Sequence, residues 1–278
     1  MKTFTLVVSF AVLALCPVTR AQEPAATTPT APIKLFDGTS LANFETWLVD
    51  HHSTDPLRVF SVVDQIDGAP AIRISGEKWG GLLTKESYRN YRFVAEYRWG
   101  GTTWGDRKAR TRDSGILLHA QGRLGNTGRD FNGPWLRSVE FQIIEGGVGD
   151  ILPVLGYEPD GTTVRPSVTS TTRKDRDGET VFDPKGASTT HTGGRINWWG
   201  RSEDWADRID FRGAQDVETA GTGWTRIEAV VDGPNLTYYV NGQLVNAATH
   251  SSFTSGKIMI QSEGAEIYFR RIELQPVR

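Results

Sequence analysis

Cysteine is almost absent from this 278-residue chain. The one cysteine, Cys16, lies in an apolar run near the N-terminus. The remaining chain can form no disulfide, so its fold must be stabilised by burial of a core. Long hydrophobic runs are lacking too. The run at 4–16 has about thirteen residues, against the roughly twenty that cross a bilayer. We therefore expect no membrane span in the mature protein.

The N-terminal run has the flanks of an export signal. Lys2 precedes it, and Pro17 and the segment 19–21 follow it, which is typical of a secretory signal peptide at 1–21. We expect a protein exported to the periplasm or the extracellular space. Lipidation of Cys16 is the alternative, but Leu15 stands where a small residue is needed. Residues 22–32, QEPAATTPTAP, predict a disordered linker.

An excess of one charge is also missing. The chain has 31 Lys and Arg against 33 Asp and Glu. Loss of 1–21 removes Lys2 and Arg20, leaving 29 basic and 33 acidic residues with both signs interspersed. This balance favours neither a nucleic acid nor a membrane surface as partner. The sequence also lacks HExxH, GxSxG and a glycine-rich phosphate loop, which excludes the enzyme classes built on those motifs.

Tryptophan and glycine are plentiful, at 9 and 30 residues, and suit a turn-rich sheet protein with flat aromatic faces for sugar rings. From Ile33 onward, short segments alternate apolar and polar residues between turn residues, and no helix-length amphipathic stretch competes with them. The pattern predicts an all-β sandwich. Its clearest predicted strands are 81–84, 91–99, 114–120, 138–144, 224–231, 236–240, 257–261 and 265–274.

One domain at 33–278 accounts for this pattern, since β-sandwiches of this size commonly form a single unit. The alternation lapses at 157–223, a polar stretch that contains Trp198, Trp199 and Trp205. Long loops of this kind usually carry function. We interpret it as a loop insertion over one face of the sandwich.

Strand parity selects candidate site residues. In 138–144 the apolar residues must face the core, so Glu140 and Gln142 face the other way. The same reasoning turns Asp113, Leu117 and His119 away from the core. If the strands are neighbours, one concave face collects Glu96, Arg98, His119, Glu140, Gln142, Gln261 and Glu263. The alternative is a solvated sheet face with salt bridges.

Several segments together resemble a known family. They are LFDGTSL at 35–41, SGILLH at 114–119, EFQI at 140–143, GKIMIQSEG at 256–264 and FRRI at 269–272. In order and spacing they resemble the 3-keto-disaccharide hydrolase domain family, over nearly the whole domain except 157–223. The resemblance implies a concanavalin A-like jelly roll of two antiparallel sheets. It also implies cleavage of glycosides that are oxidised at carbon 3.

That chemistry needs a base for the acidified hydrogen on carbon 2, an acid for the leaving oxygen and donors for the enediolate. We expect His119 and Glu140 to transfer protons. The donors and other substrate-binding residues are expected to be Glu96, Arg98, Gln142, Trp198, Trp199, Gln261 and Glu263.

Two other functions stay open. The segment 140–145 is similar to the E-x-D-x-x-E motif of laminarinase-type retaining glucanases, with Glu140 and Glu145 as the catalytic pair. Gln142 replaces the central aspartate, and a one-residue bulge would be needed to bring Glu145 to the same face. A lectin-like module is the non-enzymatic alternative, with Trp198 and Trp199 stacking sugars.

No cofactor is required by these readings. A structural calcium at Asp37 or Asp150 is an expectation for concanavalin-like folds. Asp175 and its neighbours up to Gly178 resemble a calcium loop but lack the remaining ligands, so we predict a surface turn there. His51 and His52 have no further zinc-ligand spacing around them.

Overall fold

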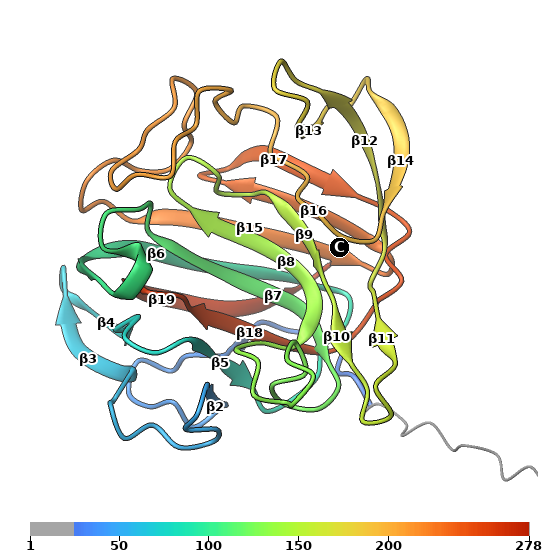
Figure 1. Ribbon diagram of the computed structural model, residues 1–278. Helices are drawn as coiled ribbons and strands as arrows, with labels where there is room; N and C mark the ends of the chain where they lie inside the picture. Colours follow the sequence, from blue (N-terminus) through green and yellow to red (C-terminus); the bar gives the residue numbers. More distant parts are fainter. Residues whose placement is uncertain (1–24, 278) are drawn as a thin grey trace, which may run out of the picture.

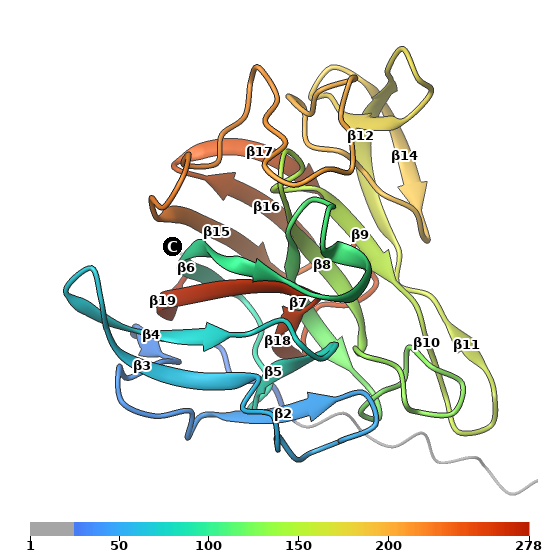
Figure 2. The ribbon, with the colours of Figure 1, turned by 60° about the vertical axis from the view of Figure 1, so that its left-hand side comes forward.

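Two antiparallel sheets lie face to face in the computed structural model, which describes residues 25–277 (Figures 1 and 2). The predicted signal peptide lies outside the described residues. One sheet has the strand order β17-β16-β15-β6-β19-β4-β3, with β1 paired to β19, and the other has the order β2-β5-β18-β7-β8-β9. This arrangement confirms the all-β jelly-roll prediction.

The strands of the eight-stranded sheet are β1 (Ile33–Lys34), β3 (Phe60–Ile66), β4 (Ala69–Ile74), β6 (Tyr91–Thr103), β15 (Thr225–Asp232), β16 (Asn235–Val240), β17 (Gln243–Ala248) and β19 (Ala265–Pro276). Those of the six-stranded sheet are β2 (Phe44–Leu48), β5 (Gly80–Thr84), β7 (Asp113–Gln121), β8 (Arg137–Ile144), β9 (Ile151–Val154) and β18 (Lys257–Ser262). All eight predicted strands are present.

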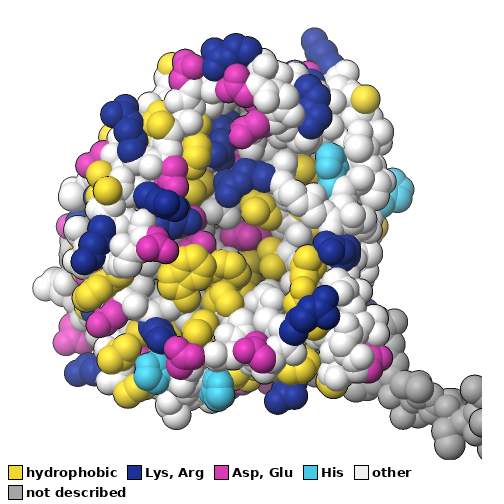
Figure 3. Space-filling view, in the orientation of Figure 1, with side chains coloured by type: hydrophobic (Ala, Val, Ile, Leu, Met, Phe, Trp, Pro, Cys, Tyr) yellow, Lys and Arg dark blue, Asp and Glu magenta, His cyan; other side chains and the backbone are white. Residues whose placement is uncertain are grey.

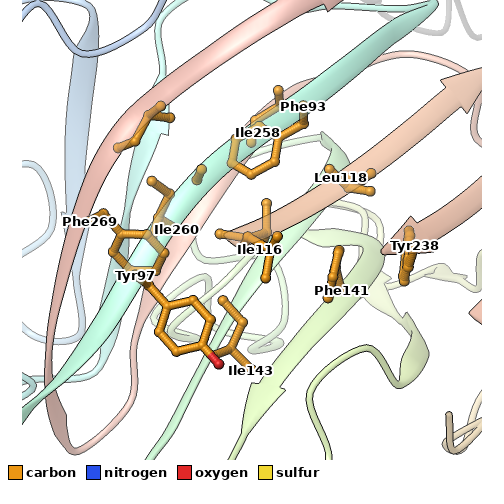
Figure 4. Close-up of a cluster of buried hydrophobic side chains, with 14 of the residues drawn as sticks. Phe93, Tyr97, Ile116, Leu118, Phe141, Ile143, Tyr238, Ile258, Ile260 and Phe269 are labelled. Atoms are coloured by element: carbon orange, nitrogen blue, oxygen red, sulfur yellow. The ribbon is translucent and has the colours of Figure 1, made fainter. Parts of the chain in front are cut away.

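The main core fills the space between the sheets, and Figure 4 shows its centre. Phe141 of β8 stacks on Tyr238 of β16, with ring centroids 4.3 Å apart and an interplanar angle of 7°. Because successive side chains of a strand alternate, β8 directs Val139, Phe141 and Ile143 into this core. Glu140 and Gln142 consequently lie on the outward face of the six-stranded sheet.

A second, smaller hydrophobic cluster lies on that outward face. It comprises Trp47, Leu83, Leu117, Ala120, Leu136 and Met259, with Leu124, Trp135 and Val154 packed against it. Trp47 Nε1 donates a hydrogen bond to Gly133 O at 2.8 Å, which ties β2 to the loop between β7 and β8. This loop therefore covers the apolar end of the outward face.

The insertion has regular structure of its own. Within it, β12 (Val168–Lys174) pairs with β13 (Thr180–Phe182) and β14 (Ala187–His191), and β11 (Thr163–Val164) pairs with β10 (Gly156–Tyr157). Bridges from Thr169 to Thr249 and from Ile151 to Ile196 join the insertion to both large sheets. Its strands are rich in Thr and half exposed, so hydrophobic alternation does not reveal them.

The structure differs from the expected disorder of the linker at Thr27. Thr27 N donates to Ser87 O at 2.8 Å, and Thr27 O accepts from Arg89 N at 3.0 Å. Backbone pairing thus holds Thr27 against the sandwich, which composition alone does not predict. Across 25–277, we find no helix of the length and apolarity that a bilayer crossing requires.

The Phe141–Tyr238 stack gives a test of the core. Phe141→Ala removes a ring that joins the two sheets, so we expect the free energy of unfolding to fall by about 3–5 kcal/mol. Denaturant unfolding measures it. The exposed Leu57→Ala is the control and should stay within about 0.5 kcal/mol of the parent. Equal effects of the two substitutions would contradict this account of the core.

Candidate active site

Carboxyl and amide side chains gather at the polar end of the outward face, where β7, β8 and β18 lie side by side. The pairs Gly115 with Gln142 and Ile116 with Ile260 set the register of these strands. All members of the group are buried, and they are Asp113, Glu140, Gln142, Gln261 and Glu263. In the orientation of Figure 1, Figure 3 shows a hollow where hydrophobic and acidic side chains meet, with Lys or Arg side chains at its edge.

Gly115 allows two of these side chains to come together. A Cβ atom at this position would collide with Oε1 of Glu140 and Oε1 of Gln261. The missing side chain on β7 therefore leaves the room in which the Glu140 carboxyl and the Gln261 amide lie over the strand.

Hydrogen bonds and ion pairs hold two of the carboxyl groups in place. Gln142 Nε2 donates to Asp113 Oδ1 at 2.6 Å. Arg107, at the end of the short 3-10 helix η1 (Gly105–Arg107), donates to Asp113 Oδ2 and lies 3.6 Å from Glu263 Oε1. Within the described residues, no ion pair holds Glu140.

Burial changes the proton affinity of the three carboxyl groups. It raises the pKa of Glu140 to about 8, and the negative charge of Asp113 adds to the effect. Burial also raises the pKa of Asp113 to about 6, against the opposing charge of Arg107, and raises the pKa of Glu263 well above its ordinary value. A carboxyl with such a pKa can give or take a proton near neutral pH.

The insertion contributes Arg195, which is anchored through Asp150. Asp150 Oδ2 accepts from Arg195 Nη1 at 2.9 Å and from Arg201, and Oδ1 accepts from Trp198 N at 2.7 Å. The positive charge of Arg195 acts on both Glu140 and Asp113, whose pKa values it lowers. Arg195 thus brings a guanidinium from the insertion to the carboxyl group cluster.

The expected calcium position at Asp150 does not fit these contacts. Its carboxylate is already bound by two guanidinium groups and an amide, which leaves little free acceptor capacity. Asp37 accepts from Thr39 N at 2.7 Å and Ser40 N at 2.8 Å in an exposed turn. Residues 25–277 contain no cluster of three or more His, Cys, Asp or Glu arranged for a metal ion.

The expected placement of Glu96 and Arg98 beside Glu140 is wrong. Both lie on β6 in the eight-stranded sheet, on the face opposite to the core. Glu96 binds Arg270 at 2.6 Å and Arg271 at 2.7 Å, and Arg98 binds Asp67 at 2.7 Å. The alternation of residues along β6 predicts which face of the strand is polar, but it does not predict which of the two sheets the strand belongs to.

The expected placement of His119 is also wrong, because β7 has a bulge. The register with β8 shifts between Leu118 and Gln121, and His119 adopts a φ of 54°. Its ring contacts Tyr91 edge-on, with centroids 6.1 Å apart, and Nδ1 lies 2.9 Å from Phe253 O. Burial lowers the pKa of His119 to about 4, so it is neutral at working pH.

Glu145 does not join Glu140 either. The laminarinase-type pattern needs a bulge in β8, yet the pairing with β7 is regular from Val139 to Ile144. Glu145 follows the strand, roughly 16 Å along the chain from Glu140. Its carboxylate accepts hydrogen bonds from Arg112 Nη1 at 2.5 Å and Arg112 N at 2.8 Å. Glu145 therefore has a structural role, which is to hold the segment around Arg112.

Neither predicted tryptophan of the insertion faces the carboxyl group cluster. Trp198 is 1% exposed and belongs to the main core, and its Nε1 donates to Gly146 O at 3.2 Å. Trp199 Nε1 donates to Leu244 O at 2.7 Å, at β17. The path of an irregular insertion is set by tertiary contacts, which periodicity does not contain.

Sequence reasoning missed Asp113, Arg107 and Arg195 as site residues. The parity of Asp113 on β7 was a usable signal, because it shares the outward face with Leu117. Arg107 and Arg195 come from segments without alternation. No pattern in the sequence marked them.

Several solved structures are similar to this chain. A search of curated proteins found no match. Two provisionally named glycosyl hydrolases of Parabacteroides distasonis ATCC 8503 are similar in structure. The first is 14% identical in sequence, and the likeness covers 89% of this chain and 94% of the relative, with a TM-score of 0.47. The second is 16% identical, and the likeness covers 88% of this chain and 99% of the relative, also with a TM-score of 0.47. Carbohydrate binding module CBM66 from Bacillus subtilis is 10% identical over 83% and 94%, with a TM-score of 0.41.

A family model gives the assignment that these distant likenesses do not. The model of the 3-keto-alpha-glucoside-1,2-lyase-like domain matches residues 31–275, which include both large sheets and the insertion. The match confirms the family resemblance seen in the sequence. The chain belongs to the family of 3-keto-alpha-glucoside-1,2-lyase-like domains.

Proposed function

We propose that this protein is a carbohydrate-active enzyme that cleaves 3-keto-glycosides by elimination, with Glu140 as the proton-transfer group. One observation carries the proposal. Glu140 is a 4% exposed carboxyl with a pKa raised to about 8, beside the Gln261 amide and outside any ion pair of the described residues. Membership of the family supports the substrate class. Export, as the N-terminal pattern predicts, is part of the same proposal.

The reaction follows from the ketone at carbon 3. Ionised Glu140 takes the proton from carbon 2, and the electron pair of that bond forms the enediolate. The ketone then reforms, a double bond forms between carbons 1 and 2, and the bond from carbon 1 to the glycosidic oxygen breaks. Protonated Glu140 returns the proton to the departing oxygen. Addition of water across the double bond would make the net reaction a hydrolysis.

The remaining groups of the site suit the developing negative charge. The guanidinium groups of Arg107 and Arg195 are donors held in place by Asp113 and Asp150, and the Gln261 amide lies beside Glu140. Donors that are fixed before the reaction stabilise an enediolate without reorganising. Asp113 and Gln142 position Arg107 and the neighbouring strand, and so act through other groups.

An isosteric substitution tests the role of Glu140. Glu140→Gln keeps the shape of the side chain but removes proton transfer, so we expect turnover of a 3-keto-disaccharide to fall at least about 100-fold. Glu228→Gln, on the eight-stranded sheet, is the matched control and should keep full activity. Near-normal turnover in Glu140→Gln would refute the proposed role. Tight sugar binding by the parent protein without any turnover would instead indicate a binding module.

The pH profile tests the direction of proton transfer. Because Glu140 must be ionised to act as the base, kcat/KM should rise with pH and level off above about 8. Initial rates between pH 5.5 and 9.5 measure this. A profile that falls through pH 8 would mean that the protonated carboxyl is the active form, contrary to the mechanism above.

Stability should have the opposite pH dependence. The pKa of Glu140 rises from an ordinary 4.5 to about 8 on folding, so the folded state binds the proton more tightly. The stability of the fold with a neutral Glu140 carboxyl is fully present below pH 4.5, and it is lost progressively as the pH rises to about 8. At pH 9, Glu140→Gln should be more stable than the parent by at least about 1 kcal/mol in urea unfolding. A less stable variant at that pH would argue against a raised pKa.

A further inference from the structure

Trp79 is the one aromatic among the large hydrophobic side chains that the described chain exposes to solvent. Its side chain is 39% exposed. It stacks on Trp135, with ring centroids 5.6 Å apart and an interplanar angle of 25°. Trp135 packs against the hydrophobic cluster of the outward face. The exposed ring therefore rests on a rigid support on the same face as Glu140.

The register of β5 places Trp79 next to the carboxyl groups. Gln261 pairs with Gly81 and Ser262 with Gly80, so Trp79 and Glu263 are the two residues just beyond the last pair of β5 and β18. A Cβ atom on Gly81 would collide with Met259 of the outward face. Trp79 lies two residues earlier, and its stack on Trp135 puts its ring on this same face.

A polar group without a partner accompanies the two rings. The Gln261 amide lies against the Glu140 carboxyl, to which it can hydrogen-bond. Trp135 Nε1 is buried and makes no hydrogen bond to another residue of 25–277. Such groups are rare, and each one unpaired lowers stability. A hydroxyl group of a bound sugar is the natural partner for this indole N–H.

We infer that Trp79, supported by Trp135, binds the leaving-group ring of a two-ring glycoside by stacking. The inference rests on the proposed function and follows from the difference in burial. Glu140 and Gln261 at the floor are almost fully buried, whereas Trp79 is exposed at the rim. The oxidised ring must reach the carboxyl at the floor, so the departing ring extends toward the rim. The apolar C–H face of a pyranose matches the indole face.

Two substrates and three variants test this inference. We expect Trp79→Ala to lower kcat/KM about tenfold for a 3-keto-disaccharide, chiefly through KM, because stacking and burial of one ring are lost. For a methyl 3-keto-glycoside, which lacks the second ring, kcat/KM should not change. Trp79→Phe should recover most of the loss. Trp224→Ala, which removes a tryptophan from the opposite sheet, is the matched control and should act like the parent. Equal losses for both substrates, or none for either, would overturn the inference.

A binding measurement separates this inference from the proposed chemistry. Calorimetric titration of Glu140→Gln with the unoxidised disaccharide should show affinity that Trp79→Ala, added to the same chain, lowers about tenfold. If no variant turns over a keto-sugar but this difference holds, the elimination mechanism fails and the stacking platform stands. If the parent is active and Trp79→Ala leaves binding unchanged, the platform fails alone.

Discussion

The alternation of β8 between two faces is the constraint on which the structure depends. Phe141 and its apolar neighbours must fill the core between the sheets, and the stack with Tyr238 fixes this orientation. Glu140 and Gln142 are thereby forced to the opposite side. A shift of one residue in register would exchange the two sets, putting carboxyl groups in the core and an aromatic ring in the site. Packing and the site therefore share one geometric cause.

Burial of several carboxyl groups opposes the stability that the core provides. Asp113, Glu140 and Glu263 are nearly inaccessible to water, and Arg107 compensates the charge of two of them. Among residues 25–277 Glu140 has no such partner, and burial raises its pKa. Functional sites commonly retain groups that a stability optimum would remove. The loss of water around the Glu140 carboxyl both raises its pKa and lowers the stability of the folded state.

Sequence periodicity predicted the all-β architecture, the eight clearest strands and the outward orientation of Glu140, Gln142 and Gln261. These depend on local alternation, which each strand carries in its own residues. It failed for Glu96 and Arg98, because sheet membership is a property of the whole topology. It failed for His119, since a bulge reverses the parity of a single residue. It missed Arg107 and Arg195, which reach the site from segments without a repeating pattern, and the backbone pairing of Thr27.

The buried carboxylate of Asp150 makes the insertion necessary for the stability of the six-stranded sheet, although the sequence of the insertion resembles a loop. Two of its arginines and one of its backbone amides neutralise and solvate a charge that sits at the end of the six-stranded sheet. A relative in which 157–223 were simply shortened would retain that charge with no counterion, a state that proteins rarely tolerate. Among relatives, a change in the length of this segment should therefore occur together with a change of the residue at position 150.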